Sequence, residues 1–178
     1  ILEEGAKFCE QVLAPTNAIG DEEGCVFEKS SKMVNTPAAF REDVRRAKGI
    51  LEQSAGRAVA GYRAPSYSIT ARSLWALDIL EELGFSYDSS IFPIRHDLYG
   101  IPGSPRFAYR AASGSLLEVP ITTVEYLGQR LPAGGGGYFR LLPYVLFRAA
   151  VRRVNTRDRQ AAVFYCHPWE IDPGQPRV

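Results

Sequence analysis

Hydrophobic positions along the chain follow two spacings, one typical of helices and one typical of buried strands. After a change of character near residue 35, apolar residues recur with steps of four, three and four: Phe40, Val44, Ala47 and Leu51. This is the period of a helix with one buried face. Thr36 and Pro37 stand before it as an N-cap and a first-turn proline, so we expect a helix that runs to about Ser54 and stops near Gly56.

The later hydrophobic runs predict two more helices separated by short strands. Thr70 opens a helix that carries leucine at positions 74, 77, 80 and 83 and closes at Gly84, and another helix runs from Tyr138 to about Val154. Four short apolar runs are strand candidates, at residues 59–63, 85–88, 116–121 and 162–166. Helix and strand therefore alternate, which favours a parallel sheet or barrel of the α/β class.

The first 35 residues differ from the rest. Residues 2–13 read as a short helix that ends before Pro15, and residues 21–25 read as a loop. We therefore expect an N-terminal helical appendage over residues 1–35 and a main domain over residues 36–178. The chain begins at Ile rather than Met, which is typical of a fragment or a processed chain.

Composition narrows the classes of function. With 178 residues, 46% of them hydrophobic, the chain can bury one substantial core. With a net charge of +1, the chain has no large excess of positive charge that would favour binding to nucleic acid. No apolar run reaches the ~18 residues of a membrane span, and the N-terminus is too acidic for a signal peptide, so we expect a cytoplasmic protein. The cysteines form no CxxC pair, which predicts free thiols at Cys9, Cys25 and Cys166.

Three predicted strands end on side chains that can take part in chemistry: Arg63, Asp88 and His167. The carboxyl ends of parallel strands open at one edge of a sheet, so we expect the guanidinium, the carboxylate and the imidazole to lie near one another. An imidazole titrates near neutral pH and can act as a general acid or base. The alternative for His167 is a hydrogen-bonded packing residue.

Four segments of the main domain resemble one enzyme family. They are F-R-E-D-V-R-R-A-K, G-Y-R-A-P-S-Y-S-I, Y-D-S-S-I-F-P-I-R-H-D-L-Y-G and F-Y-C-H-P-W-E-I-D. Over residues 36–178 the chain is similar to polysaccharide deacetylases of the NodB homology class, carbohydrate esterase family 4, and most of all to the branch found beside bacterial exopolysaccharide and PEP-CTERM loci. The resemblance implies a distorted (β/α) barrel and a bacterial hydrolase that removes acetyl groups from the N-acetylated sugars of a polysaccharide.

The resemblance also implies roles for the strand-end residues. In that family a divalent metal, usually zinc, polarises the amide carbonyl and activates water, an aspartate is the base, and a histidine protonates the leaving amine. By position, His167 matches the acid histidine. Arg63 matches the arginine that orients the catalytic aspartate, and Asp88 matches a carboxylate two units further on.

Five further residues are candidate substrate contacts: Pro65, Ser66, Tyr67, His96 and Trp169. The backbone N–H that would face the oxyanion is that of Ser66 or of Tyr67. His96 is either a substrate contact or a surface residue, and Trp169 either stacks on a sugar ring or packs in the core.

Two motifs of the family are missing. Neither the T-F-D-[DV] strand, with the base and the first metal ligand, nor the H-x-x-x-H pair is present. Their place is taken by residues 1–35, which resemble the N-terminal helical segment of acyl-CoA dehydrogenases. We therefore expect a chimera joined near residues 35–37, with a partial barrel that keeps the acid but binds no metal and needs no other cofactor.

This interpretation has alternatives and consequences for binding partners. The alternative to a deacetylase acting on an acetylated glycan is a non-catalytic carbohydrate-binding or interaction fragment; an acyl-CoA dehydrogenase ranks third because no flavin-binding sequence is present. An incomplete barrel would leave a sheet edge exposed, which predicts self-association.

Two other features have open interpretations. The glycine-rich stretch at residues 131–140 is a flexible loop or a sugar-contacting loop. A basic stretch is either a solvated helix face or a contact for acidic polysaccharide or a membrane surface; it comprises Arg148, Arg152, Arg153, Arg157 and Arg159.

Overall fold

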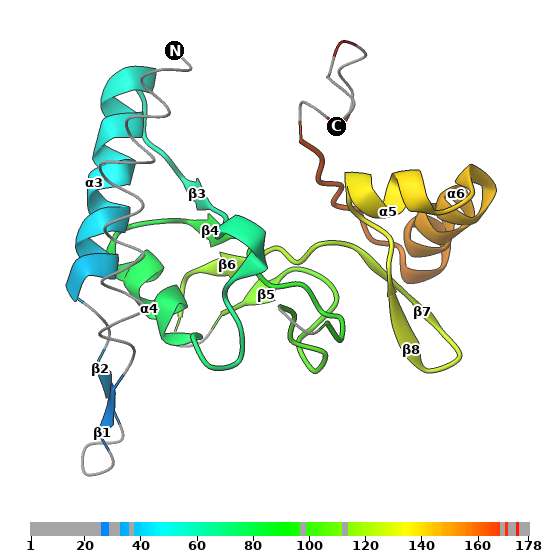
Figure 1. The fold of residues 1–178 in the computed structure, drawn as a ribbon, viewed down its shortest axis with the longest axis horizontal. Coiled ribbons are helices and arrows are strands. Elements are labelled where there is room, and N and C mark those ends of the chain that lie inside the picture. The colour runs from blue at the N-terminus through cyan, green and yellow to red at the C-terminus, as the bar shows by residue number, and fades with distance from the viewer. Residues whose placement is uncertain are drawn as a thin grey trace. The chain divides into compact units, whose positions relative to one another are not determined.

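The computed structural model describes residues 26–28, 33–35, 38–96, 99–111, 114–167, 170 and 174 (Figure 1). The chain divides into two compact units, residues 1–59 and residues 60–178, which we describe separately. No helix in the described ranges is long and apolar enough to cross a membrane.

The first unit contains two short strands and one long helix. Strand β1 (Val26–Glu28) pairs antiparallel with β2 (Met33–Asn35), and helix α3 (Ala38–Ala55) follows. The helix predicted in this region is confirmed. It ends where expected because Gly56 adopts a left-handed conformation with φ +64° and donates its N–H to the Glu52 carbonyl at 2.9 Å.

The predicted N-terminal helical segment is described only in part. Its described residues, those of β1 and β2, are extended rather than helical. The predicted helix at residues 2–13, the loop at 21–25, and Cys9 and Cys25 lie outside the described residues. Cys166 is a free, exposed thiol, as predicted.

The second unit is built on a four-stranded sheet in the order β3-β4-β6-β5 (Figure 1). Its strands are β3 (Gly61–Tyr62), β4 (Tyr87–Asp88), β5 (Tyr109–Arg110) and β6 (Leu117–Glu118). The first three in spatial order are parallel, and β5 is antiparallel to β6. Three of the four predicted strands and the α/β class are thereby confirmed. The described residues form no closed barrel, and β5 was not predicted.

Helix α4 (Trp75–Glu82) lies between β3 and β4 in the chain and buries the face that carries Leu77 and Leu80. It begins five residues later than predicted. Thr70 forms a turn instead, because its N–H donates to the Ser73 hydroxyl at 2.9 Å. The helix closes at Gly84, which has φ +75°, as predicted.

A hairpin follows the sheet. Strand β7 (Thr123–Tyr126) pairs antiparallel with β8 (Gln129–Pro132). The two connecting residues, Leu127 and Gly128, have φ of +49° and +75°, which is typical of a tight two-residue hairpin turn. The hairpin replaces part of the loop predicted from the glycine-rich stretch.

The helix predicted from Tyr138 to Val154 is wrong as a single element. Two helices occupy the region, α5 (Gly136–Leu141) and α6 (Tyr144–Arg153), and a π-helical turn, η3 (Val154–Asp158), continues α6. The break lies at Pro143. The ring of a proline disfavours a helical residue before it, and Leu142 is accordingly extended, with ψ 145°.

The strand predicted at residues 162–166 is also wrong, because this stretch joins no sheet in the described structure. Single hydrogen bonds hold it. The Val163 N–H donates to the Thr122 hydroxyl at 2.5 Å, the Thr122 N–H donates to the Val163 carbonyl at 3.4 Å, and the Gly136 N–H donates to the Tyr165 carbonyl at 2.8 Å. With a side chain as the acceptor for Val163, no strand ladder continues.

Candidate functional site

The sheet brings two of the three predicted catalytic residues to one edge. Arg63 directly follows β3, and Asp88 is the last residue of β4. Parallel pairing places Tyr62 opposite Asp88, and Asp88 opposite Glu118 at the end of β6. The predicted meeting of strand ends is therefore confirmed for Arg63 and Asp88. His167 follows a segment that belongs to no sheet.

Asp88 and Glu118 form a carboxyl pair with no exposed surface. Asp88 accepts hydrogen bonds from the Ser90 N–H at 3.1 Å and the Ser90 hydroxyl at 2.6 Å, and Glu118 accepts the Ile91 N–H at 3.1 Å. Burial, a hydrogen bond with Asp88 and the charge of Asp88 raise the pKa of Glu118 far above its usual range. The pair therefore holds a proton at neutral pH.

The carboxyl pair also supports the loop after β3. The Ser90 hydroxyl that donates to Asp88 accepts the N–H of Ala64 at 2.8 Å. Arg63 contacts Ser89 rather than a carboxylate: its Nε donates to the Ser89 carbonyl at 3.0 Å and its Nη2 to the Ser89 hydroxyl at 2.8 Å. The guanidinium carbon of Arg63 lies 5.2 Å from the centre of the Tyr165 ring, within cation–π range.

The predicted substrate loop has a strained backbone. Pro65 and Ser66 are exposed and Tyr67 is half-buried in the turn η2 (Pro65–Tyr67). Ser66 and Tyr67 have φ of +53° and +52°, a conformation that is uncommon outside glycine. Two such residues in succession are typical of functional loops, where surrounding contacts maintain an unfavourable backbone.

His167 is held by its own segment and by Glu170. A ring nitrogen, Nε2, is hydrogen-bonded to the Tyr165 hydroxyl. The backbone N–H of His167 donates to the Glu170 carboxylate at 2.8 Å, and the other oxygen of that carboxylate pairs with Arg140 at 3.1 Å. The Glu170 side chain is only 7% exposed, so its carboxylate links the His167 backbone to Arg140 from a largely buried position.

A cavity of about 230 Å³ connects His167 with the strained loop. Its wall is mainly aromatic, and the aromatic residues are Tyr67, Phe92, Tyr99, Tyr138 and Tyr165. The Tyr67 ring centre lies 5.4–5.7 Å from those of Phe92, Tyr99 and Tyr165. Glycines at positions 134–137 and Glu170 complete the wall.

Three tyrosine hydroxyls of this cavity have a raised pKa, and burial is the main cause for each: Tyr67, Tyr99 and Tyr165. Burial raises the pKa of Tyr67, and burial together with a hydrogen bond to Tyr138 raises the pKa of Tyr99 to about 12. The Tyr67 hydroxyl is buried and has no hydrogen-bond partner in the described structure. A buried hydroxyl without a partner is unfavourable, which makes it available to a ligand with a polar group.

The remaining predicted site residues lie as follows. His96 is exposed and stacks on Tyr99, with ring centres 3.8 Å apart, so it lies behind one wall of the cavity. Trp169 lies outside the described residues. The described residues contain no group of three His, Cys, Asp or Glu side chains that could hold a metal ion, so the zinc of the resembling family has no ligand set among them.

Sequence reasoning missed Glu118, Tyr165 and Glu170. Glu118 is a carboxylate inside the apolar run at residues 116–121, a position that could have indicated a buried and paired group. Tyr165 and Glu170 flank His167 within five residues. Their roles depend on the path of the chain after residue 165, and the pattern of hydrophobic residues does not predict that path.

Comparison with known proteins gives one match. Residues 89–178 match the family model described as a domain of unknown function, DUF3473. No curated protein and no solved structure matches the chain. The matched range includes Asp88's partner Glu118, most of the cavity wall and His167.

Proposed function

This chain belongs to the DUF3473 family, and on that premise we propose that it is the C-terminal portion of a polysaccharide deacetylase-like hydrolase of exopolysaccharide biosynthesis. In this proposal His167 is the general acid for removal of an acetyl group from an N-acetylated sugar. Strands β3, β4 and β6 are then neighbouring members of the partial distorted barrel that the sequence resemblance implies. The observation that supports the proposal best is the aromatic cavity that contains both His167 and Tyr67.

The surroundings of His167 suit an acid. Cleavage of an acetamide breaks the bond between the carbonyl carbon and the nitrogen, and the departing amine needs a proton. An imidazolium can supply that proton at neutral pH. The hydrogen bond to Tyr165 and the attachment of the His167 backbone to Glu170 would hold the ring in one orientation during the transfer.

The cavity wall suits a sugar. Aromatic faces stack on the apolar faces of sugar rings, and Tyr67, Tyr99 and Tyr165 present such faces. The unpartnered Tyr67 hydroxyl could donate to the acetyl carbonyl oxygen, where negative charge develops. The left-handed Ser66 and Tyr67 lie in the loop that was predicted to contact the oxyanion. The Tyr67 N–H donates to the Ala64 carbonyl at 3.3 Å, so the Ser66 N–H is the candidate contact.

Arg63 and Asp88 have positioning roles in this proposal. Arg63 connects β3 to Ser89 and packs over Tyr165, so it would orient the cavity wall that holds His167. Asp88 is enclosed and supports the loop through Ser90 and Ala64. The roles proposed for these residues involve no metal, because the described residues contain no set of ligands that fits one.

A second function, carbohydrate binding without catalysis, is favoured by the sequence itself. The chain lacks the paired-histidine motif and the aspartate strand of the resembling family. The aromatic cavity would serve a binding fragment equally well. Acetate release separates the two once the missing motifs are restored, since a deacetylase portion should then support catalysis and a binding fragment should not.

The test uses triacetylchitotriose, an N-acetylated oligosaccharide, in two assays. First, the chain alone should bind it, as followed by calorimetry. Second, the chain is joined behind a deacetylase segment that carries the T-F-D-[DV] and H-x-x-x-H motifs, and acetate release is measured.

In the joined protein His167→Ala should lower acetate release by roughly 100- to 10,000-fold while circular dichroism stays unchanged. His96→Ala removes the other imidazole of the chain and serves as the matched control, with an expected loss of less than about tenfold. Full activity of a folded His167→Ala protein would show that the acid assignment is wrong. Failure of the chain to bind the oligosaccharide would contradict both proposals, deacetylation and carbohydrate binding.

A further inference from the structure

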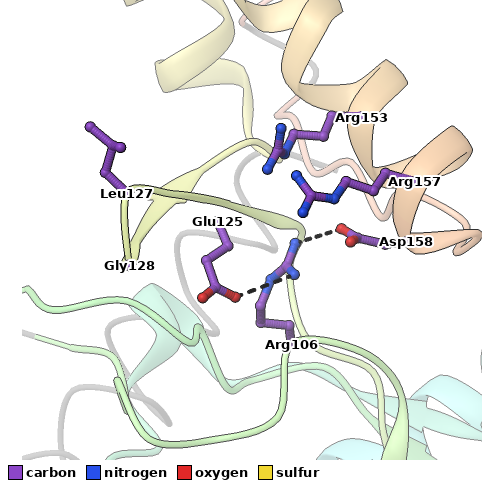
Figure 2. A pocket seen from close by; sticks show the side chains of 7 residues that line it. All are labelled: Arg106, Glu125, Leu127, Gly128, Arg153, Arg157 and Asp158. Atoms are coloured by element: carbon purple, nitrogen blue, oxygen red, sulfur yellow. Dashed lines mark hydrogen bonds and ion pairs between the residues drawn. The ribbon is translucent and has the colours of Figure 1, made fainter.

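A second cavity, of about 320 Å³, lies between the β7–β8 hairpin and the end of α6 (Figure 2). None of its lining residues lines the cavity at His167. Three arginines and two carboxylates contribute to it: Arg106, Arg153, Arg157, Glu125 and Asp158. Three positive charges thus face two negative ones, and the cavity carries an excess of positive charge.

Arg106 is the anchored cation of this group. Its side chain is 10% exposed, and its Nη2 donates to Asp158 at 2.9 Å and to the Thr123 carbonyl at 2.7 Å. Glu125 lies 3.8 Å from Nη1, and the guanidinium packs over the Phe107 ring. Both carboxylates of the cavity are therefore engaged by one arginine.

Arg153 and Arg157 are left without a carboxylate. Neither side chain has a hydrogen-bond or ion-pair partner within the described part of the chain. Figure 2 shows both guanidinium groups extending from the end of α6 toward Arg106. A helix C-terminus favours cations, which accounts for arginines at these positions but not for their convergence on a third guanidinium. Three guanidinium groups and two carboxylates leave one positive charge without a partner, and a bound anion would neutralise it.

The backbone brings the two arginines to the same side. Arg153 ends α6, and the π-helical turn η3 places Arg157 four residues further on, followed by Arg159 in a left-handed conformation with φ +53°. Such π-helical turns occur frequently at functional sites. Guanidinium groups are suited to carboxylate and phosphate because their N–H donors match two oxygens at once.

The size of the cavity indicates the size of the ligand. A volume of about 320 Å³ lies at the lower end of the roughly 300–1,000 Å³ that is typical of small-molecule sites. A larger cavity of about 630 Å³ adjoins it at Glu125 and Gly128, and Arg95 and Arg130 line that cavity. A ligand larger than a bare ion could therefore extend past the arginines.

We propose that this arginine pocket, defined by Arg106, Arg153 and Arg157, binds the oxyanion of a sugar-sized ligand, a carboxylate or a phosphate. Arg153 and Arg157 are its direct donors, and Arg106 is the anchored cation behind them. The site goes beyond the function proposed for the His167 cavity and does not depend on it.

The test compares three sugars that differ in one group: glucuronate, glucose 6-phosphate and glucose. Calorimetric titration of the full chain at low salt should show saturable binding of both charged sugars and none of glucose in the same range. Tighter binding of glucuronate identifies a carboxylate ligand, and tighter binding of glucose 6-phosphate identifies a phosphate ligand. Equal binding of glucose would overturn the proposal, as would the failure of both charged sugars to bind.

Two variants locate the site. R153Q/R157Q should weaken binding of the preferred sugar at least about tenfold, because two charge-assisted donors are lost. R148Q/R152Q removes the same charge at the same spacing from α6, outside this pocket, and should change affinity by less than about twofold. Equal losses in both proteins would mean that only overall charge matters, which would contradict the proposal.

Glu125→Gln gives a test that loss of folding cannot imitate. Its carboxylate is 55% exposed at the mouth of the pocket and repels an anion, so its removal should strengthen binding by about two- to fivefold. Unchanged or weaker binding by a folded Glu125→Gln protein would count against an anion in this pocket.

Discussion

Asp88 and His167 were both predicted as chemical groups at the end of an apolar run, yet they occupy opposite environments. Asp88 ends a strand that is paired on both sides, and it has no exposed surface. His167 ends a segment that joins no sheet among the described residues, and it lines a cavity. Pairing on both sides encloses a strand-end residue, whereas a segment held by single hydrogen bonds leaves its last side chain open to a ligand.

A polar residue at the end of an apolar run can therefore serve either the fold or a ligand site. In the carboxyl pair, the register of β4 and β6 places Asp88 beside Glu118. Ser90 donates to both oxygens of Asp88, and Ile91 donates to one oxygen of Glu118. At His167 the ring is hydrogen-bonded to Tyr165 and lines a cavity that has room for a ligand. The first arrangement stabilises the fold and the second is available for chemistry.

The largest effect is expected from breaking the carboxyl pair. Asp88→Ala removes the acceptor of the Ser90 N–H and hydroxyl and leaves both donors buried, which should lower the free energy of unfolding by about 4 kcal/mol. Asp88→Asn, which keeps one acceptor, should lose about half as much. Urea denaturation of the three proteins measures this. A loss below about 1 kcal/mol for Asp88→Ala would show that the pair is not structural.

A somewhat smaller effect is expected from pH. Because the pKa of Glu118 is raised in the folded protein above its ordinary value of 4.5, folding takes up a proton between these two values. The contribution of Glu118 to the free energy of unfolding is therefore complete below pH 4.5. Above that pH the free energy of unfolding falls, by up to about 1.4 kcal/mol per pH unit.

Glu118→Gln isolates this contribution. The amide cannot titrate, so the difference in unfolding free energy between the wild type and the variant should grow from pH 5 to pH 7 by up to about 3 kcal/mol. Urea denaturation at several pH values provides the measurement. Parallel pH profiles for the two proteins would mean that Glu118 is ionised when folded.

The smallest effect on stability is expected at the cavity. Tyr67→Phe removes a buried hydroxyl that has no partner, so stability should stay constant or rise by up to about 1 kcal/mol. Binding of triacetylchitotriose should nevertheless weaken by about tenfold, because the ligand loses a donor. If Tyr67→Phe instead destabilises the protein and leaves binding unchanged, the hydroxyl serves packing, and the contrast with the carboxyl pair disappears.

Much of the candidate site could be predicted from local sequence. Arg63, Asp88 and His167 each follow an apolar run, which is a signal within a few residues, and Pro65 to Tyr67 stand in the loop that the first run opens into. The cavity itself could not be predicted. It needs Tyr67, Phe92, Tyr138 and Tyr165 together, and these residues come from four separate segments.

Sequence by itself determined the elements whose causes are local: the apolar period of α3, its end at Gly56, the closing Gly84 and the short strands β3, β4 and β6. Pro143 was also a local signal, although the apolar period around it suggested a continuous helix. Only the tertiary structure decided which strand ends are enclosed. The raised pKa of Glu118 and the convergence of Arg106 with Arg153 and Arg157 arise between residues at least 30 positions apart. Burial and electrostatic interactions depend on which residues are close in space. The spacing of hydrophobic residues along the chain does not show which distant residues come close.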